Sequence, residues 1–181
     1  MLIGKKKGIG ILGGSFDPPH KGHLKISSIS LKKIKLKKIY WIITKKNPFK
    51  KTPHFSLKER ILRCHKITQK NSKIKILYLD DKIKSNRSID AINYLSKIKK
   101  HGNLYLILGS DNLVNFHKWK SWKKITKLTK LVVFSRKGYV KRSKDSTVVK
   151  YLNIKNIIFV NNKLINISST VIKKDYFKKV K

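Results

Sequence analysis

The chain is predicted to fold as an α/β domain with a doubly wound, mainly parallel sheet and a short helical segment at the C-terminus. Short apolar runs alternate with longer amphipathic segments, which is the order of a sheet whose crossovers are helices. With 181 residues, 40% of them hydrophobic, one core can form. No linker or internal repeat divides the chain, so residues 1–181 are expected to form a single domain.

Six apolar runs predict strands at residues 9–12, 39–43, 74–79, 104–108, 131–135 and 157–160. Helices are predicted at about 21–33, 56–69 and 88–99, with a last one starting within 168–170. The second begins at Ser56, because Ser56 and Glu59 have capping-box spacing. The first strand ends at Gly13-Gly14 and the fourth at Gly109, and ligands bind at strand ends in such sheets.

The net charge of +38 is unusual, and it raises the alternative of a nucleic-acid-binding protein. The basic residues are 41 lysines and five arginines, spread through every segment, and Ala91 is the sole alanine. This skew indicates A/T-rich codon usage rather than a binding surface, for which arginine is the better residue. No specific nucleic-acid partner is therefore expected, although a positive surface favours anionic substrates.

Features that are absent from the sequence indicate where the protein is located and which redox chemistry it can have. There is no run of eighteen apolar residues and no apolar signal-peptide core after the charged residues 1–7, so a cytoplasmic protein without a membrane span is expected. Cys64 is the only cysteine, which excludes an internal disulfide and a cysteine metal cluster. We expect Cys64 to be a buried or half-buried thiol.

The strongest motif is Gly-Gly-Ser-Phe-Asp-Pro-Pro-His-Lys-Gly-His at residues 13–23, between the first strand and the first helix. Glycines there let the backbone approach a phosphate, and a helix N-terminus offers free N–H groups. His20 and His23 share a face of the first turn, where both imidazoles can donate to a phosphate. As residues of a loop or first turn, they are expected to bury little surface. A zinc hydrolase would need further ligands, and the glycines do not match a P-loop.

This segment resembles the phosphate-binding motif of the nucleotidylyltransferase superfamily, and its Pro-Pro-His form resembles bacterial nicotinate-nucleotide adenylyltransferases. The resemblance implies a Rossmann-like nucleotidylyltransferase fold. It implies catalytic roles for His20 and His23, and a loop-holding role for Asp17. It further implies ATP binding by Gly13, Gly14, Ser15, Phe16 and Gly22.

Residues 109–122 are similar to the family's G-x-D-x-L…F-x-x-W segment. The resemblance implies that Gly109 and Asp111 bind ATP, with Gly109 letting a nucleoside approach and Asp111 accepting from a ribose. It implies that Trp119 stacks on the pyridine ring of the acceptor. Trp122 is expected to be a packing aromatic.

Residues 167–173 are similar to the family's I-S-S-T-x-I-R segment. The resemblance implies a second ATP-phosphate site, formed by hydroxyls and N–H groups at a helix N-terminus. Its members are Ile167, Ser168, Ser169, Thr170 and Lys173. Lysine stands at 173 where the family has arginine, so the charge is kept and bidentate geometry is lost.

Weaker matches imply that the acceptor is bound by Lys50, Arg87, Ser88 and Arg136, in addition to Trp119. Lys50 and Arg87 are equally consistent with solvated surface charges.

The reaction implied is transfer of AMP from ATP to nicotinate mononucleotide, giving nicotinate adenine dinucleotide and pyrophosphate. The resemblance also implies Mg²⁺ bound through the phosphates of ATP, and no protein metal site. A phosphopantetheine adenylyltransferase is the alternative within the same class. Monomer and homo-oligomer are both consistent with the sequence.

Overall fold

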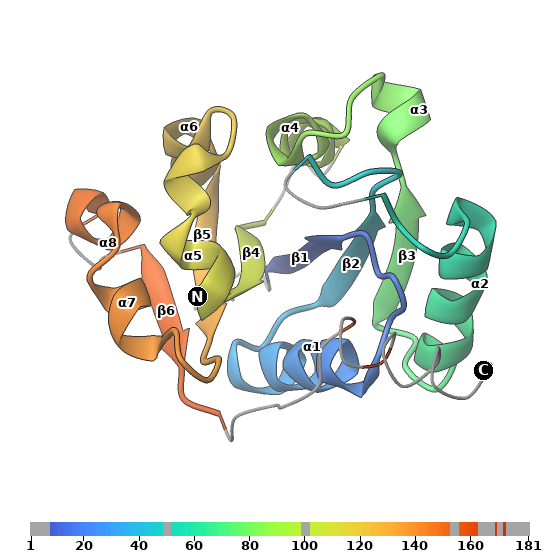
Figure 1. Ribbon diagram of the computed structural model, residues 1–181, viewed down its shortest axis with the longest axis horizontal. Coiled ribbons are helices and arrows are strands. Elements are labelled where there is room, and N and C mark those ends of the chain that lie inside the picture. The colour runs from blue at the N-terminus through green and yellow to red at the C-terminus, as the bar shows by residue number, and fades with distance from the viewer. Residues whose placement is uncertain are drawn as a thin grey trace, which may run out of the picture.

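The computed structural model describes residues 8–48, 52–98, 102–152 and 156–162, together with Ser169 and Ile172. Its centre is a six-stranded sheet in which all neighbouring strands are parallel (Figure 1). The strands are β1 (Ile9–Gly14), β2 (Lys38–Ile43), β3 (Ile74–Tyr78), β4 (Leu104–Gly109), β5 (Thr129–Phe134) and β6 (Ile157–Val160). Their order across the sheet is β3-β2-β1-β4-β5-β6.

This order places a topological switch point between β1 and β4. Successive strands are added on one side of β1 as far as β3, and the chain then returns to β4 and adds strands on the other side. Ile9 of β1 is in register with Lys38 of β2 and with Leu104 of β4. The carboxyl ends of β1 and β4 therefore lie side by side, which is where ligands bind in open α/β sheets.

Helices cover both faces of the sheet. Their bounds are α1 (Lys21–Lys33), α2 (Leu57–Thr68), α3 (Asp80–Ile83), α4 (Ser88–Ile98), α5 (Ser110–Val114), η1 (Phe116–Lys118), α6 (Trp122–Leu128), α7 (Val140–Lys144) and α8 (Thr147–Leu152). None of these helices has the length and apolar composition needed to cross a membrane.

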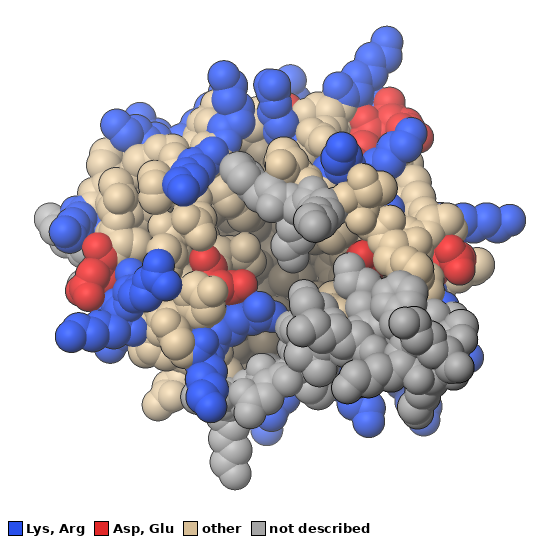
Figure 2. Space-filling model, in the orientation of Figure 1, with Lys and Arg blue, Asp and Glu red and all other residues tan. Residues whose placement is uncertain are grey.

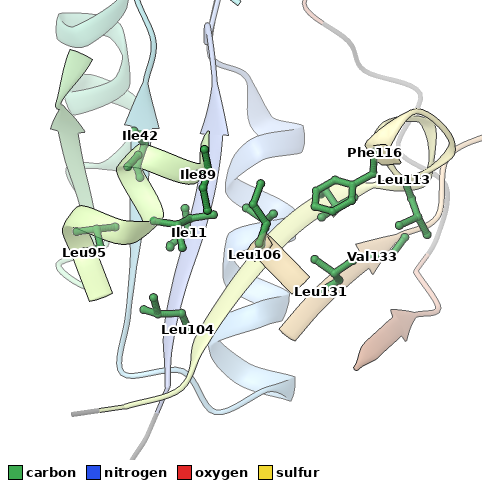
Figure 3. Packing of buried hydrophobic residues seen from close by; sticks show 14 of the residues in the cluster. Ile11, Ile42, Ile89, Leu95, Leu104, Leu106, Leu113, Phe116, Leu131 and Val133 are labelled. Atoms are coloured by element: carbon green, nitrogen blue, oxygen red, sulfur yellow. The ribbon is translucent and has the colours of Figure 1, made fainter. Parts of the chain in front are cut away.

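One hydrophobic cluster joins the sheet to α4, α5, α6 and α8 (Figure 3). Ile11 and Leu106 of the central strands meet Ile89 and Leu95 of α4, while Leu113 of α5 packs over β5. Side chains of a strand alternate between the two faces, so each buried strand serves two clusters. Because helices cover both faces of the parallel sheet, the predicted doubly wound fold is confirmed.

The second cluster joins the opposite face to α1 and α2 and includes Leu12, Trp41 and Cys64. The fully buried residues of α1 are small, since Gly22, Ser27 and Ser30 face the sheet while its leucines are only half-buried. Ser27 accepts a hydrogen bond from the indole N–H of Trp41 at 2.9 Å. The small residues let α1 approach the sheet closely, and this holds its N-terminus against the end of β1.

Predicted and observed elements agree for all six strands and for the three long helices. The first strand ends at the two glycines as predicted, but it is two residues longer than the predicted range 9–12, because Gly13 and Gly14 also pair with β2. The short helices α3, α5, α6, α7 and α8 were not predicted, since elements of four to seven residues show too little hydrophobic periodicity. From the predicted C-terminal helix the structure describes only Ser169 and Ile172, and both are helical.

Candidate active site

A cavity of about 610 Å³ opens at the carboxyl ends of β1 and β4. Every predicted site residue that the structure describes lines this cavity. They are Gly13, Gly14, Ser15, Phe16, His20, Gly22, His23, Arg87, Ser88, Gly109, Asp111, Trp119, Arg136 and Ser169. The structure thus brings together residues from the three motifs, although they are far apart in the sequence.

The remaining predicted residues lie outside the part of the chain that the structure describes. They are Lys50 of the predicted acceptor site, and Ile167, Ser168, Thr170 and Lys173 of the predicted second phosphate site. Ser169, from the same segment, donates a hydrogen bond from its hydroxyl to the carbonyl oxygen of Pro18 at 3.0 Å. This bond connects the segment to the motif that follows β1.

His20 and His23 form a capping box at the start of α1. The Nδ1 atom of His20 accepts the backbone N–H of Gly22 at 3.1 Å, and the backbone N–H of His20 donates to Nδ1 of His23 at 3.1 Å. The ring centroids are 3.8 Å apart. Because Nδ1 acts as an acceptor in both rings, each neutral imidazole carries its hydrogen on Nε2. The geometry gives two side-chain donors at a helix N-terminus, which suits a phosphate.

The expectation that these histidines bury little surface is wrong for His20. It is buried, with 6% of its surface exposed, and its side chain caps the N-terminus of α1. Part of its contribution is therefore to the stability of the helix start.

Phe16 packs behind the histidines rather than standing in the open cavity. Its ring lies 4.9 Å from Trp41 in a stacked arrangement and 4.9 Å from His23, and only 3% of it is exposed. The backbone of Phe16 has a φ of +48°, which turns the chain after β1 so that the ring reaches the core. Phe16 and Trp41 both pack against the His23 ring and hold it in place.

Gly13 leaves room at the mouth of β1. A Cβ built on this glycine would have no protein atom within 4 Å, although Gly13 lines the cavity. Packing within the protein therefore does not require a glycine at this position. The open space agrees with the predicted close approach of a phosphate to the backbone.

The structure adds a second reason for a glycine at position 109. A Cβ on Gly109 would lie 2.3 Å from Oδ1 of Asp111, so the glycine makes room for this carboxylate. Oδ2 of Asp111 forms an ion pair with Arg136 at 3.0 Å, and Ser110 Oγ accepts the backbone N–H of Arg136. Oδ1 of Asp111 is buried and has no hydrogen-bond partner among the described residues. A buried, unpaired carboxylate oxygen lining a cavity is a strong acceptor for a ligand hydroxyl.

Trp119 lies on the cavity wall, and its ring packs against the ring of Phe116. The two ring centroids are 4.9 Å apart, and Phe116 is fully buried. Lys118 and Lys120 also line the cavity, so the half-buried indole has a cation on either side in the sequence. Trp122 does not line the cavity and packs edge-on against Tyr151 at 5.0 Å, as expected for a packing aromatic.

Several polar residues of the cavity were missed by the sequence prediction, among them Thr44, Asp80, Asn86 and Asn162. Oδ2 of Asp80 accepts the Thr44 hydroxyl at 2.8 Å and the Lys45 backbone N–H at 2.7 Å. The Asn86 side chain donates to the carbonyl of Lys46 at 3.1 Å. Thr44, Asp80 and Asn162 follow β2, β3 and β6 within two residues, so the strand-end rule could have found them.

Asp17 holds a loop and does not line the cavity, as predicted. Its two carboxylate oxygens accept the backbone N–H groups of His54 and Phe55 at 3.0 and 2.9 Å.

Cys64 is fully buried, and burial raises the pKa of its thiol to about 12. A thiol in this state is protonated and inert at neutral pH, so Cys64 is a structural residue.

Basic side chains are not confined to the surroundings of this cavity. Figure 2 shows Lys and Arg side chains projecting all around the visible face, with a few acidic residues between them. This distribution agrees with the even spread of lysine along the sequence.

The sequence and the fold match a known family of enzymes. The model of the cytidylyltransferase-like family matches residues 11–175, so the chain belongs to this family of nucleotidyltransferases. The solved structures that resemble it include a nicotinic acid mononucleotide adenylyltransferase of Plasmodium falciparum complexed with APC. That structure has a TM-score of 0.71 and 20% identity, and the match covers 93% of this chain and 83% of the other. The same enzyme complexed with NaAD has a TM-score of 0.70.

Sequence relatives narrow the family further. A probable nicotinate-nucleotide adenylyltransferase of Pelagibacter ubique is 50% identical over 170 residues, which is 94% of each chain. A relative of the same name from a Ruegeria species is 33% identical over 72% of this chain and 68% of its own. Within the cytidylyltransferase-like proteins, the chain belongs to the nicotinate-nucleotide adenylyltransferases.

Proposed function

We propose that this protein transfers the AMP group of ATP to nicotinate mononucleotide, giving nicotinate adenine dinucleotide and pyrophosphate. The observation that carries the proposal is the pair of histidines at the N-terminus of α1, lining a cavity that also holds Asp111 and Trp119. The relatives that share most of the chain's length carry the name of this activity.

The acceptor phosphate is itself the nucleophile, so no covalent enzyme intermediate is needed. It attacks the α-phosphorus of ATP, and the bond to the bridging oxygen of pyrophosphate breaks. The protein therefore has to align the two phosphates and stabilise the charge that develops on them. We assign the Nε2 hydrogens of His20 and His23 to the α- and β-phosphates of ATP.

The other residues of the site can be grouped by the part of each substrate that they would contact. Gly13 and Gly14 bring the backbone close to the phosphates, and Asp111 accepts from the ribose through Oδ1. Trp119 offers its face to the pyridine ring, with Arg87, Ser88 and Arg136 nearby in the cavity wall. Ser169, Thr170 and Lys173 are assigned to the outer phosphates of ATP, and Lys50 to the acceptor.

Magnesium enters this proposal as part of the substrate, bound to the phosphates of ATP. Among the described residues, the carboxylates that line the cavity are those of Asp80 and Asp111, and both are engaged by protein groups. Within the described residues no three His, Cys, Asp or Glu side chains form a group that could hold a metal. When bound with ATP, Mg²⁺ would neutralise charge on the leaving pyrophosphate.

Nicotinate mononucleotide is expected to be used at least about tenfold better than its amide, a difference of about 1.4 kcal/mol. The reason is the positive charge of the cavity, because Lys118, Lys120, Arg87 and Arg136 line it and favour an extra carboxylate. The measurement is pyrophosphate release from ATP and Mg²⁺ with three acceptors in parallel: nicotinate mononucleotide, nicotinamide mononucleotide and phosphopantetheine. Equal use of the first two, or use of phosphopantetheine alone, would contradict the proposed substrate.

Binding to DNA or RNA is expected to be weak and independent of sequence, because the lysines are dispersed rather than collected in a groove. Such binding is electrostatic and should be lost steeply between about 50 and 200 mM salt. Fluorescence anisotropy with several labelled oligonucleotides across this salt range measures it. Tight binding at the higher salt, with a clear preference for one sequence, would favour the nucleic-acid alternative.

A further inference from the structure

Arg60 of α2 is a buried arginine that the proposed chemistry does not use. Only 2% of the residue is exposed, and it does not line the cavity. Among the described residues, no carboxylate lies within ion-pair distance of it. Burial lowers the pKa of Arg60, and the nearby carboxylates of Asp17 and Asp80 oppose this shift. The guanidinium remains charged at neutral pH, because its ordinary pKa is far higher.

Backbone carbonyl groups compensate this buried charge. The Nε of Arg60 donates to the carbonyl of Phe55 at 3.0 Å, directly before α2. One terminal nitrogen, Nη1, donates to the carbonyls of Ser15 at 2.6 Å and Thr44 at 2.8 Å. The other, Nη2, donates to the carbonyl of Lys45 at 3.1 Å. A single planar group therefore satisfies four carbonyl oxygens from three separate segments.

Two of these segments form neighbouring parts of the cavity wall. Ser15 belongs to the loop after β1 that carries the glycines and leads to the histidines, whereas Thr44 and Lys45 begin the loop after β2. Ser15 and Thr44 both line the cavity. Asp80 accepts hydrogen bonds from Thr44 and Lys45 of the second loop, and Asp17 ties the first loop to His54 and Phe55. A backbone hydrogen bond from the Thr44 N–H to the Gly14 carbonyl at 3.1 Å joins the starts of the two loops, and the Arg60 side chain adds contacts to Ser15 in one loop and to Thr44 and Lys45 in the other.

We propose that Arg60 is a positioning residue that fixes the distance between the loop after β1 and the loop after β2. The inference rests on the proposed function for the identity of the bound groups, which are ATP phosphates at one loop and the acceptor at the other. A positioning role follows from geometry, because the fork of arginine can reach Ser15, Thr44 and Lys45 together. A lysine at 60 would keep the charge but direct its three hydrogens from one nitrogen, so it cannot serve all these carbonyls.

The test compares Arg60→Lys with two variants of the same helix. Arg63→Lys makes the same change at an exposed arginine that stacks on Phe55. Cys64→Ala shortens a fully buried side chain and so weakens the packing of α2, and Cys64 does not line the cavity. All are assayed at a temperature at which circular dichroism shows each variant to be folded. Arg60→Gln, which keeps two N–H donors without charge, is measured alongside in case the lysine variant does not fold.

We expect Arg60→Lys to lower kcat/KM at least about tenfold and to raise the KM of both substrates, because small misplacements of reacting groups are costly. Hydrogen–deuterium exchange should become faster in residues 13–20 and 44–48 together. Arg63→Lys and Cys64→Ala should keep kcat/KM and the exchange of both loops close to wild type, even where Cys64→Ala lowers Tm.

The proposal is wrong if the Arg60 variants keep kcat/KM within about twofold of wild type. It is equally wrong if they merely lose activity in step with their folded fraction, as a purely stabilising residue would. Exchange in the two loops does not depend on the identity of the acceptor. A wild-type protein that releases no pyrophosphate with nicotinate mononucleotide, while Arg60→Lys loosens both loops, would refute the proposed function and leave the role of Arg60 standing.

Discussion

Replacing His23 with alanine is expected to lower kcat by about 10²–10³, or roughly 2.7–4 kcal/mol of transition-state stabilisation. The imidazole is held by a backbone N–H on Nδ1 and by the rings of Phe16 and Trp41, so its remaining N–H is a preorganised donor. A donor that acts on charge formed in the transition state affects kcat more than substrate binding. Steady-state kinetics of pyrophosphate release measure both quantities.

His20 needs a more careful variant, because its side chain also caps α1. His20→Ala should lose a similar factor in kcat and also about 1 kcal/mol of stability through the missing cap. His20→Asn keeps a side-chain acceptor suited to an N-cap but has no imidazole. It should therefore recover much of the stability and little of the rate, as measured by urea unfolding and by kinetics.

His65 on the exposed side of α2 is the matched control, and His65→Ala should leave both rate and stability near wild type. The assignment of the two histidines would be refuted by near-normal turnover in both motif variants. It would also be refuted if His20→Asn regained rate and stability together, since capping alone would then explain the loss.

Much of the fold could be predicted because the long elements carry strong local signals. The capping box at Ser56 and Glu59 begins α2 as predicted, and each strand of the sheet is an apolar run. The helices between β4 and β6 were harder to predict, because they are short and are specified by packing. Phe116 and Leu113, for example, are fully buried through contacts with the sheet rather than through a helical repeat.

The site could be predicted where the sequence preserves a continuous motif. Residues 13–23 lie together in the chain and remain together in space, so His20 and His23 were found directly. Arg60, Asp80 and Asn162 could not be found in this way, because each acts on a loop distant in sequence. Their contacts depend on strand order, which brings Ser15, Thr44 and Ser135 to one edge of the sheet.

Gly109 is a residue for which sequence and structure offer two different physical explanations. The sequence suggested a glycine that lets a nucleoside approach the strand end. In the structure an added Cβ would meet Oδ1 of Asp111, and a ligand would meet this carboxylate. The two explanations give different results when the residues are changed together.

Gly109→Ala is expected to lower kcat/KM for ATP by about 10- to 100-fold. The added methyl group would stand 2.3 Å from Oδ1 of Asp111, so the carboxylate has to move away from its place beside Arg136. A displaced carboxylate loses its hydrogen bond to the ligand, and bonds to charged groups contribute about 1.5–3 kcal/mol. Kinetics at varied ATP measure the loss, and urea unfolding measures any change in stability.

A double-mutant cycle separates the two explanations of Gly109. If the methyl group acts only by displacing Asp111, then Gly109→Ala should have almost no further effect in an Asp111→Ala background, where no carboxylate remains to be moved. If the glycine instead admits the nucleoside directly, the methyl group should obstruct the ligand in either background, and the two losses should add. Because the built Cβ meets Asp111 and lies no closer than 3.5 Å to Arg136, we expect the cycle to show strong coupling between positions 109 and 111.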